Sequence, residues 1–386
     1  MMNNETKKNG KRLPKKYWVL LICVSLAFVF ATTFFITTCY VGLDSTINYI
    51  NAFDYDYIQN ENIVVTKFKE ENYAVINNKT NRPLKILQLT DLHIGCGYLS
   101  ISYDKKLVNE IFNCVSIVNP DIIIVTGDAL SPIYTTSGTK NNYYQIDALI
   151  ALLEKLGRPY TFCFGNHDAS GIASKEVISN KLESAPKSFF LKGESDVTGE
   201  GNYYVKIQEN GVLTQSLILM DSGARASDFK YAGIDKKQVL WYEKTIKKLK
   251  EEKSDIKNLT FIHVPIPEYN AFYDKWKSGD ENYTLLNGEK CERTSAGKQS
   301  GFYDKMKELD STKWVFCGHD HTNNFSIKEN STGITLSYGM SMDFTTYPVL
   351  KYKTHQRGGK VIYLDGENVD LKLAPQDKKY QEVDFI

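Results

Sequence analysis

The first extended feature of the chain is a long uncharged stretch near its N-terminus. Residues 17–43 carry no charged side chain, and residues 18–41 are strongly apolar. A helix rises about 1.5 Å per residue, so roughly 20 residues cross the hydrocarbon core of a bilayer. Tyr17, Trp18 and Tyr40 lie near the ends of this stretch, as aromatic rings do at membrane interfaces. The pattern predicts one transmembrane helix over residues 17–43.

Charge on either side of this stretch indicates its orientation. Residues 1–16 hold six basic side chains and one acidic side chain, Glu5. After the stretch, every charged residue before Lys67 is acidic. The positive-inside rule makes residues 1–16 a cytoplasmic tail and places the body outside the cell or in a lumen. The alternative is a cleaved signal peptide, but the stretch exceeds the usual apolar region of roughly 7–15 residues and no A-x-A-like site follows it. We therefore predict a single-pass signal-anchor, with the membrane as a partner.

The body begins with a polar and aromatic segment and continues with buried strands. Residues 44–83 contain two short strand-like runs, 63–68 and 73–77, which we interpret as a stalk with an edge hairpin. Three apolar runs then alternate with two segments of helical spacing: runs at 84–89, 122–125 and 160–164, helices at 107–118 and 143–156. Uninterrupted apolar strands separated by helices are typical of α/β layers.

Strands dominate the second half of the body. The predicted strands cover residues 203–208, 216–220, 259–264, 314–317, 334–338 and 360–364, and one clear helix lies near 236–250. So many strands favour a second sheet packed on the first. We predict an α/β fold, a two-sheet β-sandwich flanked by helices. This domain covers residues 84–375 and is followed by a C-terminal tail over 376–386.

Composition and cysteine spacing indicate an ordinary globular protein without a cysteine-based scaffold. Apolar residues make up 42% and charged residues 24% of the chain, as in ordinary globular proteins. The formal net charge of +1 gives no electrostatic reason to expect nucleic-acid binding. Two of the seven cysteines, Cys23 and Cys39, lie in the apolar stretch, and no pair has C-x-x-C spacing. A disulfide scaffold and a cysteine-based zinc site are therefore not favoured.

Residues able to bind metal follow the ends of the predicted strands. Five of the six histidines stand there, next to Asp, Asn and Gly, and His355 is the exception. A single histidine is more often structural, but five such placements together indicate a site. The crevice at the carboxyl ends of strands is where open α/β sheets bind ligands, and mixed imidazole and oxygen donors suit first-row transition ions. The candidates are Asp91, His93, Asp128, Asn166, His167, Asp168, His263, His319 and His321.

The order of these motifs resembles that of the calcineurin-like metallophosphoesterases. The family's motifs D-x-H, G-D, G-N-H-[DE], an isolated His and G-H-x-H stand here as 91–93, 127–128, 165–168, His263 and 318–321. Further segments, including LKILQLTDLHIG, SLILMDSG and VFCGHDHTNNF, are similar to the single-domain purple-acid-phosphatase-like branch of plants and fungi. The resemblance spans roughly residues 84–365 and implies a phosphate-ester substrate.

The resemblance also implies a role for each candidate. Two divalent or mixed-valence transition ions (Mn, Fe or Zn) are held, one by Asp91, His93 and His321, the other by Asn166, His263 and His319, with Asp128 bridging them. A metal-bridging hydroxide attacks phosphorus. His167, oriented by Asp168, donates a proton to the leaving group, although a purely structural role for this histidine stays open. Purple members have a tyrosine where this chain has Ser131, so we expect no purple charge-transfer band.

The resulting hypothesis is a phosphomonoesterase or phosphodiesterase on the non-cytoplasmic side of a membrane. One alternative keeps the fold but makes the substrate a nucleotide, a pyrophosphate or a phosphoprotein. Another is a catalytically inactive, membrane-attached binding module. The complete set of ligands favours an enzyme over that module.

Overall fold

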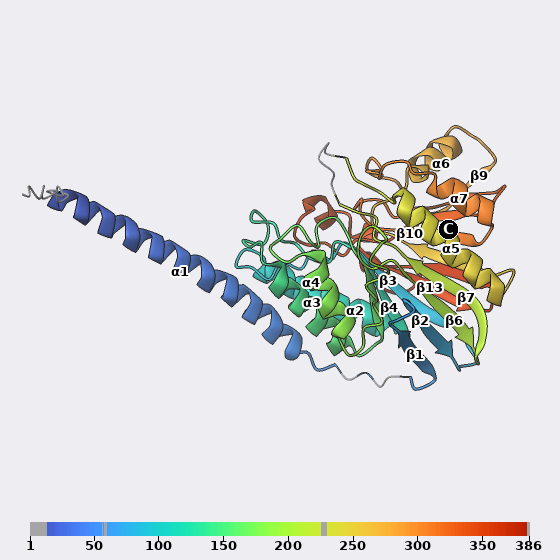
Figure 1. Ribbon diagram of the computed structural model, residues 1–386, viewed down its shortest axis with the longest axis horizontal. Helices are drawn as coiled ribbons and strands as arrows, with labels where there is room; N and C mark the ends of the chain where they lie inside the picture. Colours follow the sequence, from blue (N-terminus) through green and yellow to red (C-terminus); the bar gives the residue numbers. More distant parts are fainter. Residues whose placement is uncertain (1–13, 56, 58–59, 225–229, 384–386) are drawn as a thin grey trace, which may run out of the picture.

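A long helix projects from the body of the protein (Figure 1). The computed structural model describes residues 14–55, 57, 60–224 and 230–383. Helix α1 covers Lys15–Asn51, and its part Lys15–Phe34 is exposed, and long and apolar enough to cross a membrane. Of the predicted cytoplasmic tail, residues 1–13 lie outside the described residues.

The C-terminal end of α1 belongs to the body. The helix continues eight residues past the predicted boundary at 43, so the prediction of a stalk from residue 44 is wrong for this part. Leu43, Ile47 and Ile50 follow helical spacing and pack against the main core. A Cβ added to Gly42 would lie 2.5 Å from the carbonyl carbon of Gly97, so the two backbones touch. The helix thus continues beyond the uncharged stretch, because its last turns are amphipathic and pack one face on the core.

The smaller sheet contains the first ligand-bearing strands. Its order is β14-β13-β3-β4-β5, with β3 (Leu84–Leu89), β4 (Ile122–Thr126) and β5 (Tyr160–Cys163) parallel to one another. Strands β13 (Gly358–Asp365) and β14 (Asn368–Pro375) extend it antiparallel. The carboxyl ends of the three parallel strands therefore meet at one edge.

The larger sheet has the order β1-β2-β6-β7-β8-β10-β12-β11-β9. Its central strands β7 (Val212–Leu219), β8 (Lys257–Phe261), β10 (Thr312–Cys317) and β12 (Thr335–Tyr338) are parallel. The outer strands are β1 (Ile63–Phe68), β2 (Tyr73–Asn78), β6 (Tyr203–Glu209), β11 (Ser326–Glu329) and β9 (Tyr283–Asn287). The β1–β2 pair forms a hairpin at one edge.

The two sheets pack face to face between two layers of helices (Figure 1). Helices α2 (Ile101–Val118), α3 (Asn142–Leu156) and α4 (Lys175–Ser184) lie on the side of the smaller sheet. Helices α5 (Lys236–Glu252), α6 (Glu268–Lys277) and α7 (Phe302–Leu309) lie on the side of the larger one. One core joins both sheets with α2 and α3, and a second lies beneath α5, α6 and α7. The predicted sandwich flanked by helices is confirmed.

The C-terminal segment is packed rather than free. After two short turns of 3-10 helix, Pro348–Lys351 and Thr354–Gln356, and the β13–β14 hairpin, a third turn covers Gln376–Lys378. Tyr380 is buried, and its hydroxyl donates a hydrogen bond of 2.6 Å to Glu110. The prediction of a separate tail from residue 376 is therefore wrong for the described residues up to 383, because this buried tyrosine fixes the segment to α2.

Candidate metal centre

Backbone turns at the strand ends aim the candidate ligands at one space. Asp91 and His93 follow β3, and Asp128 follows β4; all three have left-handed backbone, with φ of 53°, 51° and 48°. Such φ values are uncommon for residues other than glycine and cost roughly 1–3 kcal/mol each. Strain of this kind gathers at functional sites, where the surrounding structure compensates for it. The strained turns thus mark the edge that the sequence indicated.

Two glycines allow the ligands to approach one another. Gly127 has φ of 83°, and a Cβ there would lie 2.6 Å from Nδ1 of His263. A Cβ on Gly318 would lie 2.1 Å from Oγ1 of Thr90 and 2.9 Å from Oδ2 of Asp91. All three distances are far shorter than van der Waals contact. Glycine, which has no Cβ, therefore permits the close approach before Asp128 and His319.

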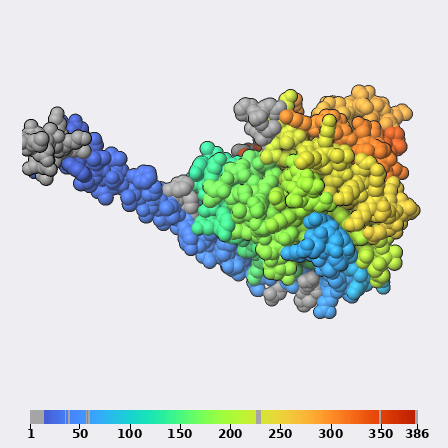
Figure 2. Space-filling model, viewed as in Figure 1, coloured from blue at the N-terminus to red at the C-terminus, as the bar shows by residue number. Residues whose placement is uncertain are grey.

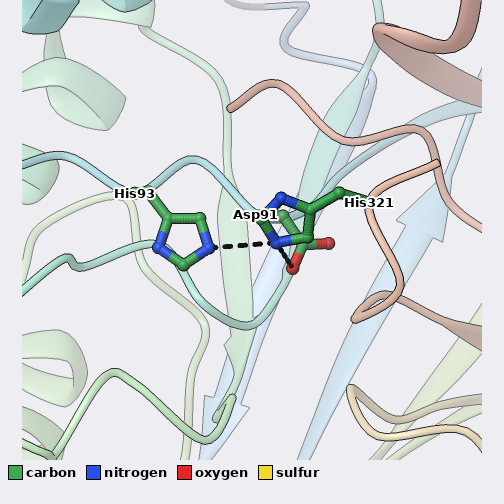
Figure 3. A group of neighbouring side chains, drawn as sticks. All are labelled: Asp91, His93 and His321. Atoms are coloured by element: carbon green, nitrogen blue, oxygen red, sulfur yellow. Dashed lines mark hydrogen bonds and ion pairs between the residues drawn. The ribbon is translucent and has the colours of Figure 1, made fainter. Parts of the chain in front are cut away.

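The first ligand group consists of Asp91, His93 and His321 (Figure 3). Nε2 of His321 lies 3.2 Å from Nε2 of His93 and 3.3 Å from Oδ1 of Asp91. The other oxygen of Asp91 accepts a hydrogen bond of 2.9 Å from the Thr90 hydroxyl, which leaves Oδ1 facing the histidines. Two segments more than 220 residues apart, 91–93 and 321, supply this group.

The second group consists of Asp128, His263 and His319. Nε2 of His263 lies 3.2 Å from Oδ2 of Asp128 and 3.2 Å from Nδ1 of His319. Asn166 is next to Gly165, on which a Cβ would lie 2.2 Å from Oδ1 of Asp128. The amide oxygen of Asn166 is buried, and no hydrogen bond to it is present within the described residues. Asn166 is thus placed beside this group as a possible fourth donor.

The donor atoms fit transition ions. Bonds from zinc to histidine nitrogen are about 2.0–2.1 Å, so donor atoms around one such ion stand roughly 3 Å apart. The contacts of 3.2–3.3 Å within each group have this spacing. The buried amide oxygen of Asn166 accepts no hydrogen bond from the described residues, which is costly for a polar atom unless an ion compensates. The residues present therefore fit two metal ions.

Groups behind the ligands fix the orientation of two imidazole rings. Nδ1 of His263 lies 2.8 Å from the carbonyl oxygen of Thr126, a contact that leaves Nε2 free to act as a donor atom. Nδ1 of His321 lies 3.2 Å from Oδ2 of Asp343. Asp343 is buried and also accepts hydrogen bonds from the backbone of Thr345 and Tyr347.

Sequence reasoning missed Asp343. It stands five residues after the end of β12, and this strand end has no histidine or glycine–ligand pair of the kind that drew attention elsewhere. The available signal was weak: an aspartate five residues after the end of a predicted strand. Only the fold brings it to His321.

Charge is balanced within the metal-free centre. Burial opposes the charged form of His263, but nearby Asp128 outweighs it and raises the pKa of His263 to about 9. Burial likewise disfavours charge on His321, and Asp91 and Asp343 nevertheless raise its pKa well above the usual value. Burial lowers the pKa of His93 to about 4. Without ions, protons on His263 and His321 therefore compensate the carboxylates.

His167 and Asp168 do not form the predicted pair. The carboxylate of Asp168 accepts hydrogen bonds from the backbone amides of Asp128, Leu130 and Gly165 at 2.7–3.0 Å. No bond from Asp168 to the His167 ring is present among the described residues, so the predicted orientation of His167 by Asp168 is wrong. Three amides from two loops occupy the carboxylate instead. The buried Asp168 carboxylate thus links the loop of Asp128 to the loop of Asn166 through hydrogen bonds.

His167 stands at the mouth of the centre. Its backbone N–H donates a hydrogen bond of 2.7 Å to Oδ1 of Asp128, and its ring centroid lies 5.6 Å from that of His93. The ring is half-buried. It lines a cavity of about 360 Å³ together with His93, Asp128, His319, His321 and Tyr347. The cavity gives a substrate access to both ligand groups and to His167.

Sequence comparison agrees with this geometry. The family model described as calcineurin-like phosphoesterase matches residues 84–323, more than half of the chain. The protein named "Probable inactive purple acid phosphatase 14" from Arabidopsis thaliana is 26% identical over 69% of this chain and 72% of its own length. "Phosphatase DCR2" from Saccharomyces cerevisiae is 27% identical over 66% of this chain, which spans about half (47%) of that relative.

Structural comparison gives the same fold. A dimetal phosphatase from Danio rerio superposes with a TM-score of 0.53 at 11% identity, covering 78% of this chain and 99% of its own. At such low identity the likeness bears on the fold alone. The chain belongs to the calcineurin-like phosphoesterase family.

Proposed function

We propose that the protein is a dinuclear metal-dependent hydrolase of phosphate esters, acting on the non-cytoplasmic side of a membrane. The observation that carries the proposal is the pair of adjacent ligand groups, each with donor atoms within 4.8 Å of one another, beneath one open cavity. Asp91, His93 and His321 would hold one ion, and His263, His319 and Asn166 the other. Asp128, whose Oδ2 faces His263 from between the strand ends, would serve both.

The chain supplies the ligand arrangement, and bound ions would act as Lewis acids. Such transition ions would polarise the phosphoryl oxygens and make water nucleophilic near neutral pH. Asp168 keeps the Asp128 and Asn166 loops in register through its three amide contacts. His167, at the mouth of the cavity, is placed to give a proton to the departing alkoxide.

The names of three plant relatives include the word "inactive", which favours the alternative of a binding module. Two features of this chain support catalysis instead. Every ligand position of the family motif holds a residue able to bind a metal, and the buried amide oxygen of Asn166 has no hydrogen-bond partner within the described structure. A module that no longer bound ions would gain stability by replacing that amide, because an unsatisfied buried polar group is costly.

Turnover by the full chain tests the proposal. The protein is purified in detergent, loaded with manganese, zinc or iron, and offered para-nitrophenyl phosphate and bis-para-nitrophenyl phosphate. We expect turnover of at least one ester, lost on chelation and in Asp128→Asn. The matched control is Asp304→Asn, an exposed carboxylate paired with Lys307. Full metal loading without turnover of a phosphoester panel that includes nucleotides, pyrophosphate and phosphopeptides would contradict the enzyme and leave the binding module.

Orientation is tested separately. Protease added to intact cells should degrade a body that lies outside the cell. A body that lies in a lumen should stay protected after the plasma membrane alone is opened, since the proposal places only residues 1–16 in the cytoplasm. Degradation of the body that begins when the plasma membrane alone is opened would reverse the orientation without affecting the chemistry.

A further inference from the structure

Exposed apolar side chains stand on the loops that follow the ligand-bearing strands. Tyr98 and Leu99 follow the Asp91–His93 motif, Tyr134 follows Asp128, Ile172 follows His167, and Tyr352 follows Asp343. Their exposed fractions are 58%, 52%, 51%, 70% and 81%. We call these five side chains the apolar rim. Large apolar groups gathered on one exposed face mark a contact surface.

The loops of the apolar rim touch one another. The backbone N–H of Leu99 donates to the carbonyl of Ser137 in the loop of Tyr134, at 3.3 Å. The N–H of Ile172 donates to the carbonyl of Lys140 in that same loop, at 3.1 Å. Three of the ligand-bearing loops are thereby tied into one surface.

This surface is continuous with α1. Gly42 lies against Gly97, one residue before Tyr98. Ile36 and Tyr40 of the helix line a cavity of about 300 Å³ together with Tyr134 and Ile172. Those two rim residues therefore stand at the level at which the predicted transmembrane stretch ends. In Figure 2 the teal and green part of the body lies beside the point where α1 leaves it.

Cations and a second cavity join the rim to the metal centre. A cavity of about 610 Å³ is lined by Tyr352, Lys106, Lys351, Arg357 and Tyr347. Tyr347 also lines the cavity over the ligand groups. Aromatic rings with basic side chains beside them are typical of protein surfaces at the level of lipid headgroups.

We propose that the apolar rim rests on the bilayer that α1 crosses, and that the centre takes phosphate esters presented by lipids of that bilayer. This inference rests on the proposed function and names its substrate class. The headgroup enters between the cationic cavity and His167, while the rim holds the mouth of the site against the membrane. A soluble ester reaches the same centre without needing the rim.

Contact with the bilayer is tested without activity. The full chain is reconstituted in vesicles containing brominated phosphatidylcholine, and tryptophan is introduced by Tyr134→Trp, Ile172→Trp or, as a control, Leu240→Trp, which is 65% exposed on α5. Relative to the parent chain, we expect added quenching of the two rim tryptophans and none of the control. Equal quenching at all three positions would overturn the contact.

Substrate class is tested on the same vesicles. Phosphatidic acid and phosphatidylcholine serve as lipid monoester and diester, and para-nitrophenyl phosphate as the soluble ester. The variant Tyr98→Ser/Leu99→Ser/Ile172→Ser should hydrolyse the lipid ester that the parent hydrolyses roughly tenfold more slowly, because the effective concentration of lipid headgroups at the tethered site falls. Its rate on the soluble ester should be unchanged. The control Val212→Ser/Leu240→Ser should keep both.

The outcomes separate the two proposals. If the parent hydrolyses the soluble ester but neither lipid, or if the rim and control variants behave alike, the lipid proposal fails while the phosphoesterase stands. If the parent hydrolyses no ester although its ions are bound, the proposed function fails, and quenching still decides whether the rim touches the bilayer.

Discussion

The ligand groups and the apolar rim occupy the same strand-end loops but differ in every physical respect. Asp91, His93 and Asp128 are buried and lie on left-handed backbone, and groups behind other ligands fix their rings, such as Thr126 behind His263. The rim side chains stand a few residues further along the same loops and are more than half exposed. In the two proposals made above, the beginning of such a loop would hold the ions, and its tip would meet the membrane. Changes at the beginning should affect every ester, and changes at the tip only some.

The largest effect is expected for Asp128→Asn. Its carboxylate lies against His263 and accepts the N–H of His167, so an amide removes negative charge from the second ligand group. Loss of an outer support costs about 10–100-fold, and loss of the proposed bridging ligand should cost more, roughly 10³-fold. Rates on soluble and lipid esters should fall together, as steady-state assays would measure. A drop confined to one ester would contradict the division between ligands and rim.

His167→Asn should act through the leaving group. A general acid contributes about 10²–10⁴-fold, and mainly where the departing alkoxide is a strong base. We expect roughly a 10²-fold loss of kcat on alkyl phosphates and little loss on para-nitrophenyl phosphate, with metal content unchanged. Equal losses on both esters would assign His167 a structural role.

Asp343→Asn tests the support behind His321. The change weakens the contact of 3.2 Å to Nδ1 and should lower metal affinity about 10–100-fold. Glu289→Gln is the matched control, because it alters the exposed carboxylate–histidine pair with His355, outside the centre. Metal titration measures the metal affinity of both variants. Equal affinities would show that Asp343 does not support metal binding.

Metal binding should release protons. The raised pKa values of His263, to about 9, and of His321 mean that both rings carry a proton at pH 7 before ions bind. Ligands must give up their protons, so loading should release roughly two protons per chain and weaken as the pH falls. Calorimetry in buffers of different ionisation enthalpy measures the number. No dependence on buffer would contradict protonated ligands.

The smallest effect is expected where α1 meets the loop of the first motif. The Thr46 hydroxyl donates to Asp104, at 3.4 Å, and Asp104 accepts from the backbone of Gly95 and Cys96. Thr46→Val should lower the free energy of unfolding by about 1 kcal/mol or less. Thr32→Val is the control, a threonine in α1 that bonds only within the helix. Thermal unfolding that is equally unaffected in both would show that this contact contributes nothing.

Local sequence patterns predicted the strands and the ligands at their ends, because both depend on residues that are neighbours in the sequence. The parallel strands of the smaller sheet followed from continuous apolar runs, and Asp91, His93, Asp128, His263, His319 and His321 were placed together because all follow strand ends. These residues are close in space because the fold brings strand ends to one edge.

Features that depend on tertiary contacts could not be predicted from the sequence. Asp343 has no sequence neighbour that points to His321. The family resemblance assigned Asp168 to His167, whereas its carboxylate bonds to amides of another loop. The docking of α1 needed the partner surface at Gly97. The rim was invisible because single apolar loop residues are ordinary until several share a face.

Metal content measured together with turnover tests the central claim most directly. The full chain is purified, stripped with a chelator, reloaded, and analysed for bound ions by mass spectrometry while hydrolysis of para-nitrophenyl phosphate and its bis ester is followed. The account predicts two transition ions per chain, no purple absorption band because Ser131 replaces the tyrosine, and turnover that disappears and returns with the ions. A chain that binds two ions yet hydrolyses no phosphate ester, or that turns over fully without them, would contradict it.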